Sequence, residues 1–456
     1  MSRLGKRKGG CCLVILALAA GMVSAGEEHS GGATTVFESG PSAFARPLAN
    51  ISRELRREHS VGNSFFNQNW VAAPSSTEAR DGLGPIFNAR SCSACHVKDG
   101  RGRPPEQGEA IFTMVLRLSI PGRRADGGPV PEPNYGLQFH PRSLPGIVPE
   151  GWAAVSYEEE HVAMKDGAPF SLRTPSYEFG SLRHGPMHSE VRLSPRVAPA
   201  VHGMGLLEAV PAAVILAHAD PDDADGDGIS GRPNLVPDLA AGGAKVIGRF
   251  GWKANEPTVR QQTAGAFQSD LGITTDLFPD EILPKGGTTA PSGGQPEADT
   301  KVLDRVTTYL LTLAPPARRN WKEPQVIAGK EIFSQIGCAK CHFPELKTGE
   351  YPAVPELEHQ NIRPYTDLLL HDMGEQLADG REDYEAGGTE WRTPPLWGIG
   401  LQEVVSGHLH LLHDGRARGF AEAILWHGGE GEASREAFTE LNHEEREALF
   451  AFLWSL

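Results

Sequence analysis

The chain has 456 residues, of which 39% are hydrophobic and 22% are charged, and its formal net charge is −15. This length and composition are those of a soluble globular protein with two or three domains, and they exclude a disordered chain. The acidic balance argues against nucleic acid or anionic lipid as a partner, and it suits either a basic partner protein or a solvated surface without one.

The first 25 residues differ from this average. Four basic residues precede an apolar run over residues 11–23, and Val23, Ser24 and Ala25 offer small side chains for cleavage. This order predicts a secretory signal peptide over residues 1–25. The alternative is an uncleaved membrane anchor, but the run is shorter than the roughly 20 residues that a spanning helix needs. Cleavage takes the net charge from −15 to −19 by removing four positive charges, and it leaves a mature chain without a predicted transmembrane span.

The pattern Cys-x-x-Cys-His occurs twice, in "RSCSACHVKDGRG" (residues 90–102) and in "AGKEIFSQIGCAKCH" (residues 328–342). Because Cys11 and Cys12 leave with the signal peptide, every mature cysteine belongs to one of these motifs. A shared zinc site is disfavoured, because the two cysteine pairs lie more than 240 residues apart and each has its own histidine. A thioredoxin-like dithiol needs a βαβ setting, which neither stretch provides.

Each motif instead predicts a covalently bound haem c. Two thioethers fix the edge of the porphyrin through the cysteines, while the histidine that follows turns its imidazole to the iron. Covalent attachment of this kind normally follows export, which the signal peptide predicts independently. The sequence therefore predicts two haems, with His96 and His342 as the proximal iron ligands. The predicted attachment residues are Cys92, Cys95, Cys338 and Cys341.

The two motifs also belong to an internal repeat of low identity. Each looks like the end of a short helix, and a helical pattern closes each half of the chain, over residues 300–316 and 442–456. Pro315 and Pro316 end the first closing helix, which places a domain boundary near residue 318.

We therefore predict a mainly α fold of two cytochrome c-like helical domains, residues 26–318 and residues 319–456. The first domain carries a long insertion, about residues 110–290, that is rich in Gly, Pro and turn signals. Strict alternation of apolar and polar residues is scarce there, so we expect few strands, mostly in short hairpins.

The stretch "DDADGDGISGRPN" (residues 222–234) predicts a calcium site. Asp223, Asp225 and Asp227 alternate before Gly228, as at the start of a loop in which carboxylates converge on the ion. Asn234 stands where such a loop usually ends in glutamate. The ion would be structural and would hold the insertion near the haems, and the alternative is an acidic turn without metal.

Taken together, these motifs resemble the bacterial di-haem cytochrome c peroxidase and MauG superfamily, and most closely its exported di-haem oxidoreductase branch, often labelled thiol oxidoreductase-like. The resemblance runs from about residue 60 to the C-terminus. It is carried by "TEARDGLGPIFNARSCSACH", "GMGLLEAV", "DADGDGISGRPN", "GRFGWKA", "YTDLLLHDMG", "EWRTPPLWGIG" and "LHDGRARGFAEAILWHGGE".

The resemblance implies a six-coordinate haem in the C-terminal domain, a high-spin haem with an open distal face in the N-terminal domain, and a tryptophan between them. It places the distal ligand of the C-terminal haem at His427, after the sequence His413-Asp414-Gly415. A bis-histidine haem would follow, with a lower potential than histidine and methionine together give. Met373 competes for this position, and His427 could instead merely fill a helix end.

For the N-terminal haem, the resemblance implies that Trp252 is the relay between the haems and that Gln262 belongs to the distal pocket. Asp270 is the nearest carboxylate to the family's distal glutamate, and Glu208 is an alternative. Cleavage of peroxide requires a base that takes a proton and returns it to the leaving oxygen, beside a polar group that stabilises the separating charge. Gln262 could equally be a polar residue on a helix surface.

Five further side chains could close the distal face of the first haem, which would then only transfer electrons. They are His184, His188, His202, Met204 and His218.

The function expected from these features is that of an exported di-haem c-type oxidoreductase, peroxidase-like, in the periplasm of a Gram-negative bacterium. Electrons from a small cytochrome or cupredoxin would pass through the C-terminal haem to a catalytic N-terminal haem, with hydrogen peroxide as the small oxidant. The alternative is a non-catalytic electron-transfer cytochrome. Thiol exchange by the chain itself is disfavoured, because thioethers would occupy all four mature cysteines.

Overall fold

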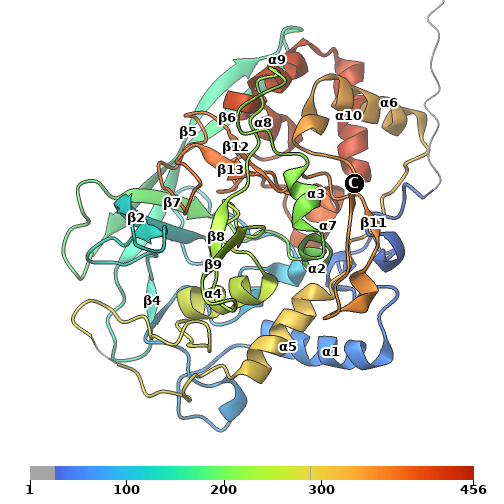
Figure 1. Ribbon diagram of the computed structural model, residues 1–456. Helices are drawn as coiled ribbons and strands as arrows, with labels where there is room; N and C mark the ends of the chain where they lie inside the picture. The colour runs from blue at the N-terminus through green and yellow to red at the C-terminus, as the bar shows by residue number, and fades with distance from the viewer. Residues whose placement is uncertain (1–25, 288) are drawn as a thin grey trace, which may run out of the picture.

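The computed structural model describes residues 26–287 and 289–456 (Figure 1). The predicted signal peptide, residues 1–25, lies outside the described residues. Within these ranges, the helices are all too short or too polar to cross a membrane.

Two helix pairs, one near each Cys-x-x-Cys-His motif, form the frame of the molecule. They lie at opposite ends of it in Figure 1 and comprise α1 (Arg53–Asn67) with α5 (Thr300–Leu311), and α6 (Pro324–Gln335) with α10 (His443–Ser455). Each pair crosses at a glycine. A Cβ on Gly62 of α1 would lie 2.0 Å from the carbonyl oxygen of Arg305, and a Cβ on Gly329 of α6 would lie 1.9 Å from that of Ala448. The backbones therefore touch at both crossings, as the internal repeat suggests.

The sequence explains where these helices begin. Ser52, Asp299 and Asn442 stand at the N-caps of α1, α5 and α10, and each side chain accepts a hydrogen bond from the first turn. At α10, Glu445 also returns a bond to the backbone of Asn442 and completes a capping box. α6 begins with a proline in its first turn. α4 (Val259–Leu271), which packs against α5, is capped by the side chain of Thr258.

Shorter elements lie between these helices. They include α2 (Met204–Glu208), α3 (Ala212–Leu216), α7 (Gln402–Ser406), α8 (Phe420–Leu425), α9 (Glu432–Glu440) and the 3₁₀ turns of both motifs. Only the second motif follows a helix, α6. The first follows the two-residue strand β1, so the expectation of a helix there was wrong.

The expected mainly α fold is also wrong, because the structure is only 28% helical and 18% strand, in many small sheets. All strand pairs outside isolated bridges are antiparallel. The sheets are β1 (Ile86–Phe87) with β4 (Arg142–Ser143); β2 (Val115–Arg123) between β3 (Pro129–Val130) and β7 (Arg192–Arg196); β5 (Trp152–Ala163) with β6 (Pro169–Gly180); β8 (Leu235–Asp238) with β9 (Ala244–Ile247); β10 (Leu346–Lys347) with β11 (Asn361–Ile362); and β12 (Leu370–Asp372) with β13 (Glu390–Arg392).

The β5–β6 hairpin shows why the sequence did not reveal these strands. It pairs twelve residues on each side, yet β5 contains three consecutive glutamates, which have low strand propensity. Contacts with the C-terminal half hold its tip. Met164 is buried there, and Asp166 forms a 2.6 Å ion pair with Arg446 of α10. Long-range docking therefore stabilises strands that local propensity does not predict.

Three hydrophobic clusters connect the two halves. One surrounds the first motif and includes Trp70 and Tyr309, and a second surrounds α6 and α10. The third contains both Trp252 and Trp391. The predicted domain boundary near residue 318 falls after α5 and before α6, and it stays a prediction.

Candidate functional site: a cavity shared by both motifs

One continuous cavity reaches both Cys-x-x-Cys-His motifs. The four cysteines are not joined in disulfides, so their sulfur atoms are free to bond to other groups. Most of the predicted site residues also line this cavity. They are Cys92, Cys95, His96, Trp252, Gln262, Asp270, Cys338, Cys341, His342, Met373 and His427.

The two motif histidines are oriented in the same way. His96 Nδ1 lies 2.7 Å from the carbonyl oxygen of Pro199, and His342 Nδ1 lies 3.1 Å from that of Tyr365. A backbone acceptor at Nδ1 fixes the tautomer in which Nε2 keeps its lone pair, and that nitrogen can bind a metal. Burial lowers the pKa of both histidines, that of His342 to about 4, which keeps the imidazoles neutral as ligation requires.

His427 follows α8 and repeats this arrangement. Its Nδ1 lies 2.7 Å from the carbonyl oxygen of Ala423. His427 also lies close enough to His342 that a positive charge on it helps to lower the pKa of His342. Met373 lines the same part of the cavity, and its methyl group lies near Gly431, as the side chain of His427 does. The structure therefore brings both predicted ligands to the C-terminal motif, and the choice of His427 stays a prediction.

Unpaired buried polar groups test whether this cavity fits haem. Arg101 is only 8% exposed, and its Nε has no hydrogen-bond partner among the described residues. The same is true of Gln402 Nε2 and His202 Nδ1, and all three side chains line the cavity. Arg392 lines it too, and its guanidinium donates hydrogen bonds of 3.0 Å to Gly251 O and Thr393 O. Across the described ranges, neither arginine forms an ion pair with a carboxylate. Burial lowers the pKa of each guanidinium to about 10.

Buried charges are normally paired, so a cavity with two unpaired arginines fits an anionic ligand. A haem carries two propionate carboxylates, and guanidinium groups bind carboxylates well. Both arginines also meet at Trp252. The guanidinium carbon of Arg101 lies 4.9 Å from the centre of its ring system, and the backbone N–H of Arg392 donates a 2.9 Å hydrogen bond to its carbonyl oxygen. Arg101 and Arg392 are thus the residues suited to hold haem propionates.

The cavity is lined by a second tryptophan, Trp391, that sequence analysis missed. Trp252 Nε1 donates to Val197 O at 2.9 Å, and Trp391 Nε1 donates to Leu377 O at 3.0 Å. The imidazole of His413 stacks on Trp391 with ring centres 3.8 Å apart, and the ammonium of Lys253 lies 4.5 Å from the Trp391 ring. Trp391 lies in the matched stretch "EWRTPPLWGIG", but only the fold brings it beside Trp252.

The predicted distal residues of the first haem lie on α4. Gln262 and Asp270 both face the cavity. Asp270 lies toward the cysteines, since its charge adds to the burial that raises the pKa of Cys92 and Cys95, and Gln138 Nε2 donates to its carboxylate at 2.9 Å. The roles predicted for these residues are not tested by this placement.

Glu208 is outside the cavity lining. Its carboxylate accepts a 2.5 Å hydrogen bond from the backbone N–H of Val259, at the start of α4, and another from the hydroxyl of Tyr351. Glu208 therefore positions the helix that carries Gln262.

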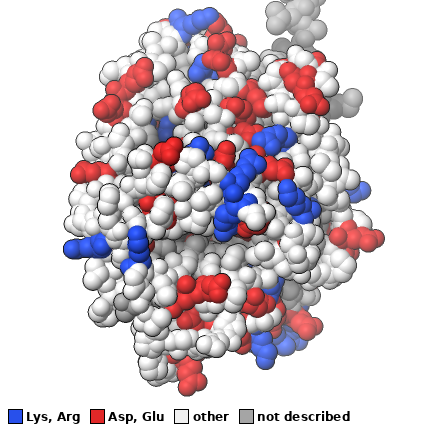
Figure 2. Space-filling view, turned by 60° about the vertical axis from the view of Figure 1, so that its left-hand side comes forward, with Lys and Arg blue, Asp and Glu red and all other residues white. Residues whose placement is uncertain are grey.

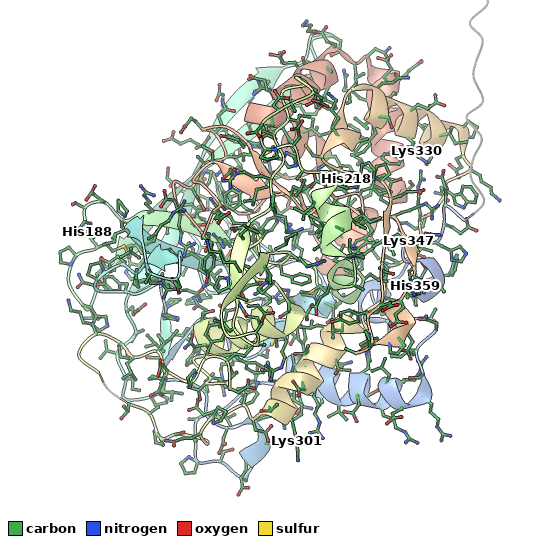
Figure 3. All side chains as sticks on the ribbon, in the orientation of Figure 1. His188, His218, Lys301, Lys330, Lys347 and His359 are labelled. Atoms are coloured by element: carbon green, nitrogen blue, oxygen red, sulfur yellow. The ribbon has the colours of Figure 1, made fainter. Side chains whose placement is uncertain are left out.

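Among the further ligand candidates, His202 and Met204 line the cavity, whereas His184, His188 and His218 do not. In Figure 3 His188 lies at the outer edge of the molecule and His218 lies beside α3. His218 packs against Phe343, with ring centres 4.0 Å apart. His202 Nε2 is 3.1 Å from Trp397 O.

The acidic loop is arranged differently from the prediction. Carboxylate oxygens of Asp220, Asp223 and Asp225 lie within 4.8 Å of one another. Asp227 points elsewhere, because its carboxylate forms a 2.9 Å ion pair with Lys340 inside the second motif. The loop thus contacts the C-terminal motif directly, and Asp220 was missed because it precedes the alternating pattern.

A fold in which two haem-binding motifs, a set of unpaired arginines and two tryptophans share one cavity defines a di-haem redox protein. The family model described as "Di-haem oxidoreductase, putative peroxidase" matches residues 25–120 and 123–456. The chain therefore belongs to the di-haem oxidoreductase family, as its resemblance predicted. No curated protein and no solved structure matches the chain significantly.

Proposed function

We propose that the chain is an exported di-haem c-type oxidoreductase of the Gram-negative periplasm that reduces hydrogen peroxide. The observation that carries the proposal is the single cavity onto which both motifs, Trp252 and Gln262 open. When bound, the two haems supply iron centres that accept and pass on single electrons. The family description, which includes peroxidase, supports the same reaction class.

Each part of the cavity has a role in this proposal. Thioethers at the four motif cysteines would attach the haems, and His96 and His342 would be iron ligands. His427 would be a further ligand at the C-terminal site, which suits electron entry, and Trp252 would couple the two sites. Gln262 would stabilise the charge that separates when peroxide is cleaved.

Electrons would come from a small cytochrome or cupredoxin. Figure 2 shows a face on which acidic groups are spread over much of the surface while several Lys and Arg side chains gather near its centre. A basic partner would meet the acidic groups, in keeping with the net charge of −19 that the sequence predicts for the mature chain. We also propose that Asp223 and Asp225 bind calcium with Asp220, while Asp227 stays with Lys340.

Peroxide turnover with a reduced small c-type cytochrome as donor tests the function. Wild-type protein should oxidise the donor in proportion to the peroxide added. Trp252→Phe should slow turnover without lowering the haem content. Trp321→Phe is the control, because Trp321 is outside the cavity lining, and it should leave both turnover and haem content unchanged. Absence of peroxide turnover by the half-reduced and fully reduced wild type would contradict the proposal. In the denatured mature protein, alkylation should find no free thiol.

The competing function is electron transfer without catalysis. Met204 favours this function, because its side chain belongs to the N-terminal half of the chain and lines the cavity. If Met204 binds the iron of the N-terminal haem, peroxide has no free position on that iron. Met204→Leu separates the two functions. If Met204 is a ligand, the substitution should convert a low-spin haem to high spin.

A further inference from the structure

Glu256 lies directly behind the wall of the cavity, in the loop that leads into α4. Its backbone pairs with Phe250, with N–H···O distances of 2.9 and 3.2 Å. Its carboxylate accepts hydrogen bonds from Gln261 Nε2 at 3.0 Å and from Asn255 Nδ2 at 3.4 Å. The loop therefore holds this carboxyl group in one place.

Gln261 fixes the carboxyl group further. It is 3% exposed, its Oε1 accepts from Leu239 N at 2.9 Å, and its Nε2 also donates to Pro237 O at 3.1 Å. Every polar atom of this amide is engaged, so its donation to Glu256 has a defined direction. Gly265 of α4 leaves room beside it, since a Cβ there would lie 3.8 Å from Glu256 Oε1.

The neighbours of Glu256 open onto the cavity. Asn255 and Arg117 both line it, and so does Gln262, the residue after Gln261. The Oδ1 atom of Asn255 is buried and has no hydrogen-bond partner among the described residues. A buried polar atom without a partner needs explanation, and a ligand or water molecule in the cavity would satisfy it.

Burial and nearby charges bring the pKa of the Glu256 carboxyl group close to neutral pH. Burial raises the pKa of its carboxyl group to about 7, the charge of Asp383 acts in the same direction, and Arg117 and the hydrogen bonds from Gln261 and Asn255 oppose them. Tyr384 also faces this group, and the charge of Glu256 helps to raise the pKa of the Tyr384 hydroxyl. A carboxyl group with such a pKa can gain or lose a proton at the pH of the periplasm.

We propose that Glu256 exchanges protons with the peroxide-binding part of the cavity, through water that the unpartnered Asn255 Oδ1 would hold there. The inference rests on the proposed function. Reduction of one hydrogen peroxide to two water molecules consumes two electrons and two protons; the reduced donor supplies the electrons and the solvent supplies the protons. Through this water, Glu256 as carboxylate accepts a proton from the peroxide and returns it to the oxygen that leaves as water when the O–O bond breaks, so Glu256 ends the step as a carboxylate again. Because Glu256 does not line the cavity, it does not touch the peroxide and is a positioning residue for the proton.

The test compares holoprotein variants over a range of pH. The wild-type rate with peroxide should rise as the pH passes through about 7, where Glu256 loses its proton. Glu256→Gln should lower the rate by about 10²- to 10⁴-fold, the usual contribution of a general base, and remove this pH dependence. Glu256→Asp should keep the pH dependence at an intermediate rate. Glu281→Gln is the matched control, because burial also raises the pKa of that carboxyl group but it is outside the cavity lining.

A second readout does not depend on turnover. The infrared band of a protonated carboxyl group should titrate near pH 7 in the wild-type holoprotein and in Glu281→Gln, and it should be missing in Glu256→Gln. If Glu256→Gln keeps both the rate and its pH dependence while the wild type reduces peroxide, the inference is wrong and the proposed function stands. The inference is equally wrong if only Asp270→Asn removes the pH dependence. A wild type that is inert to peroxide overturns the proposed function and the inference with it.

Discussion

Replacement of Arg101 by methionine tests whether the cavity arginines hold haem propionates. The guanidinium is buried and lies over Trp252, with one hydrogen bond, to Leu412 O, and an unpartnered Nε. Removing one partner of a buried ion pair typically costs about 3–5 kcal/mol. A thioether-bound haem stays attached during unfolding, so the free energy of unfolding compares the same covalent species in both states. Arg101→Met should therefore lower this free energy by about 3–5 kcal/mol in the holoprotein.

The control for this substitution lies two residues away. Arg103 is exposed and pairs with Glu106 and Glu109 on the surface, so Arg103→Met should lower the free energy of unfolding by only about 0–1 kcal/mol. Arg101→Lys keeps the charge but loses the planar fork, and its effect should fall between the two. Urea unfolding followed at the Soret band measures all three variants. An Arg101→Met variant that loses no more stability than Arg103→Met would refute the assignment of Arg101 to a propionate.

Three further predictions concern the frame, the pH response and the acidic loop. Gly62→Ala drives a Cβ into the backbone of α5 and should lower the free energy of unfolding by at least about 1–3 kcal/mol, whereas Gly419→Ala, with open space around it, should not; equal urea midpoints would contradict the helix crossing. Burial lowers the pKa of His59 to about 4, below its ordinary value near 6.5, so the unfolded chain binds the extra proton between these values. The contribution of His59 to the free energy of unfolding should therefore be full above pH 6.5 and fall toward pH 4. His59→Gln should flatten this part of the profile of Tm against pH, and an unchanged slope in this variant would contradict the prediction. Chelation of calcium should lower the Tm of the wild type and of Asp222→Asn but not that of Asp223→Asn, and equal responses of all three would exclude a site at the acidic cluster.

The motifs were predictable because their chemistry is local. The spacing of Cys92, Cys95 and His96 is set by one turn of chain, so the sequence alone predicts how a haem would be held, and this attachment stays a prediction. The closing helices were predictable for a similar reason, since apolar residues recur at helical spacing in α5 and α10. The family followed from motifs distributed over most of the chain, and the family model confirms it.

The strands and part of the site depend on contacts between distant residues, which local patterns do not contain. The β5–β6 hairpin is held by Arg446, which lies 280 residues from its partner Asp166. Trp391 and Glu256 became candidates only when the fold placed one beside Trp252 and the other behind Asn255. Each lacks a sequence pattern of its own, because tryptophans are common in cores and glutamates are common in loops.

Electron paramagnetic resonance of the half-reduced protein tests the central claim most directly. The account predicts one high-spin haem, open to exogenous ligands and peroxide, and one low-spin haem that changes in His427→Met but not in His161→Met, an exposed histidine on β5. Two low-spin haems that bind neither peroxide nor exogenous ligands would contradict the account and identify an electron-transfer protein.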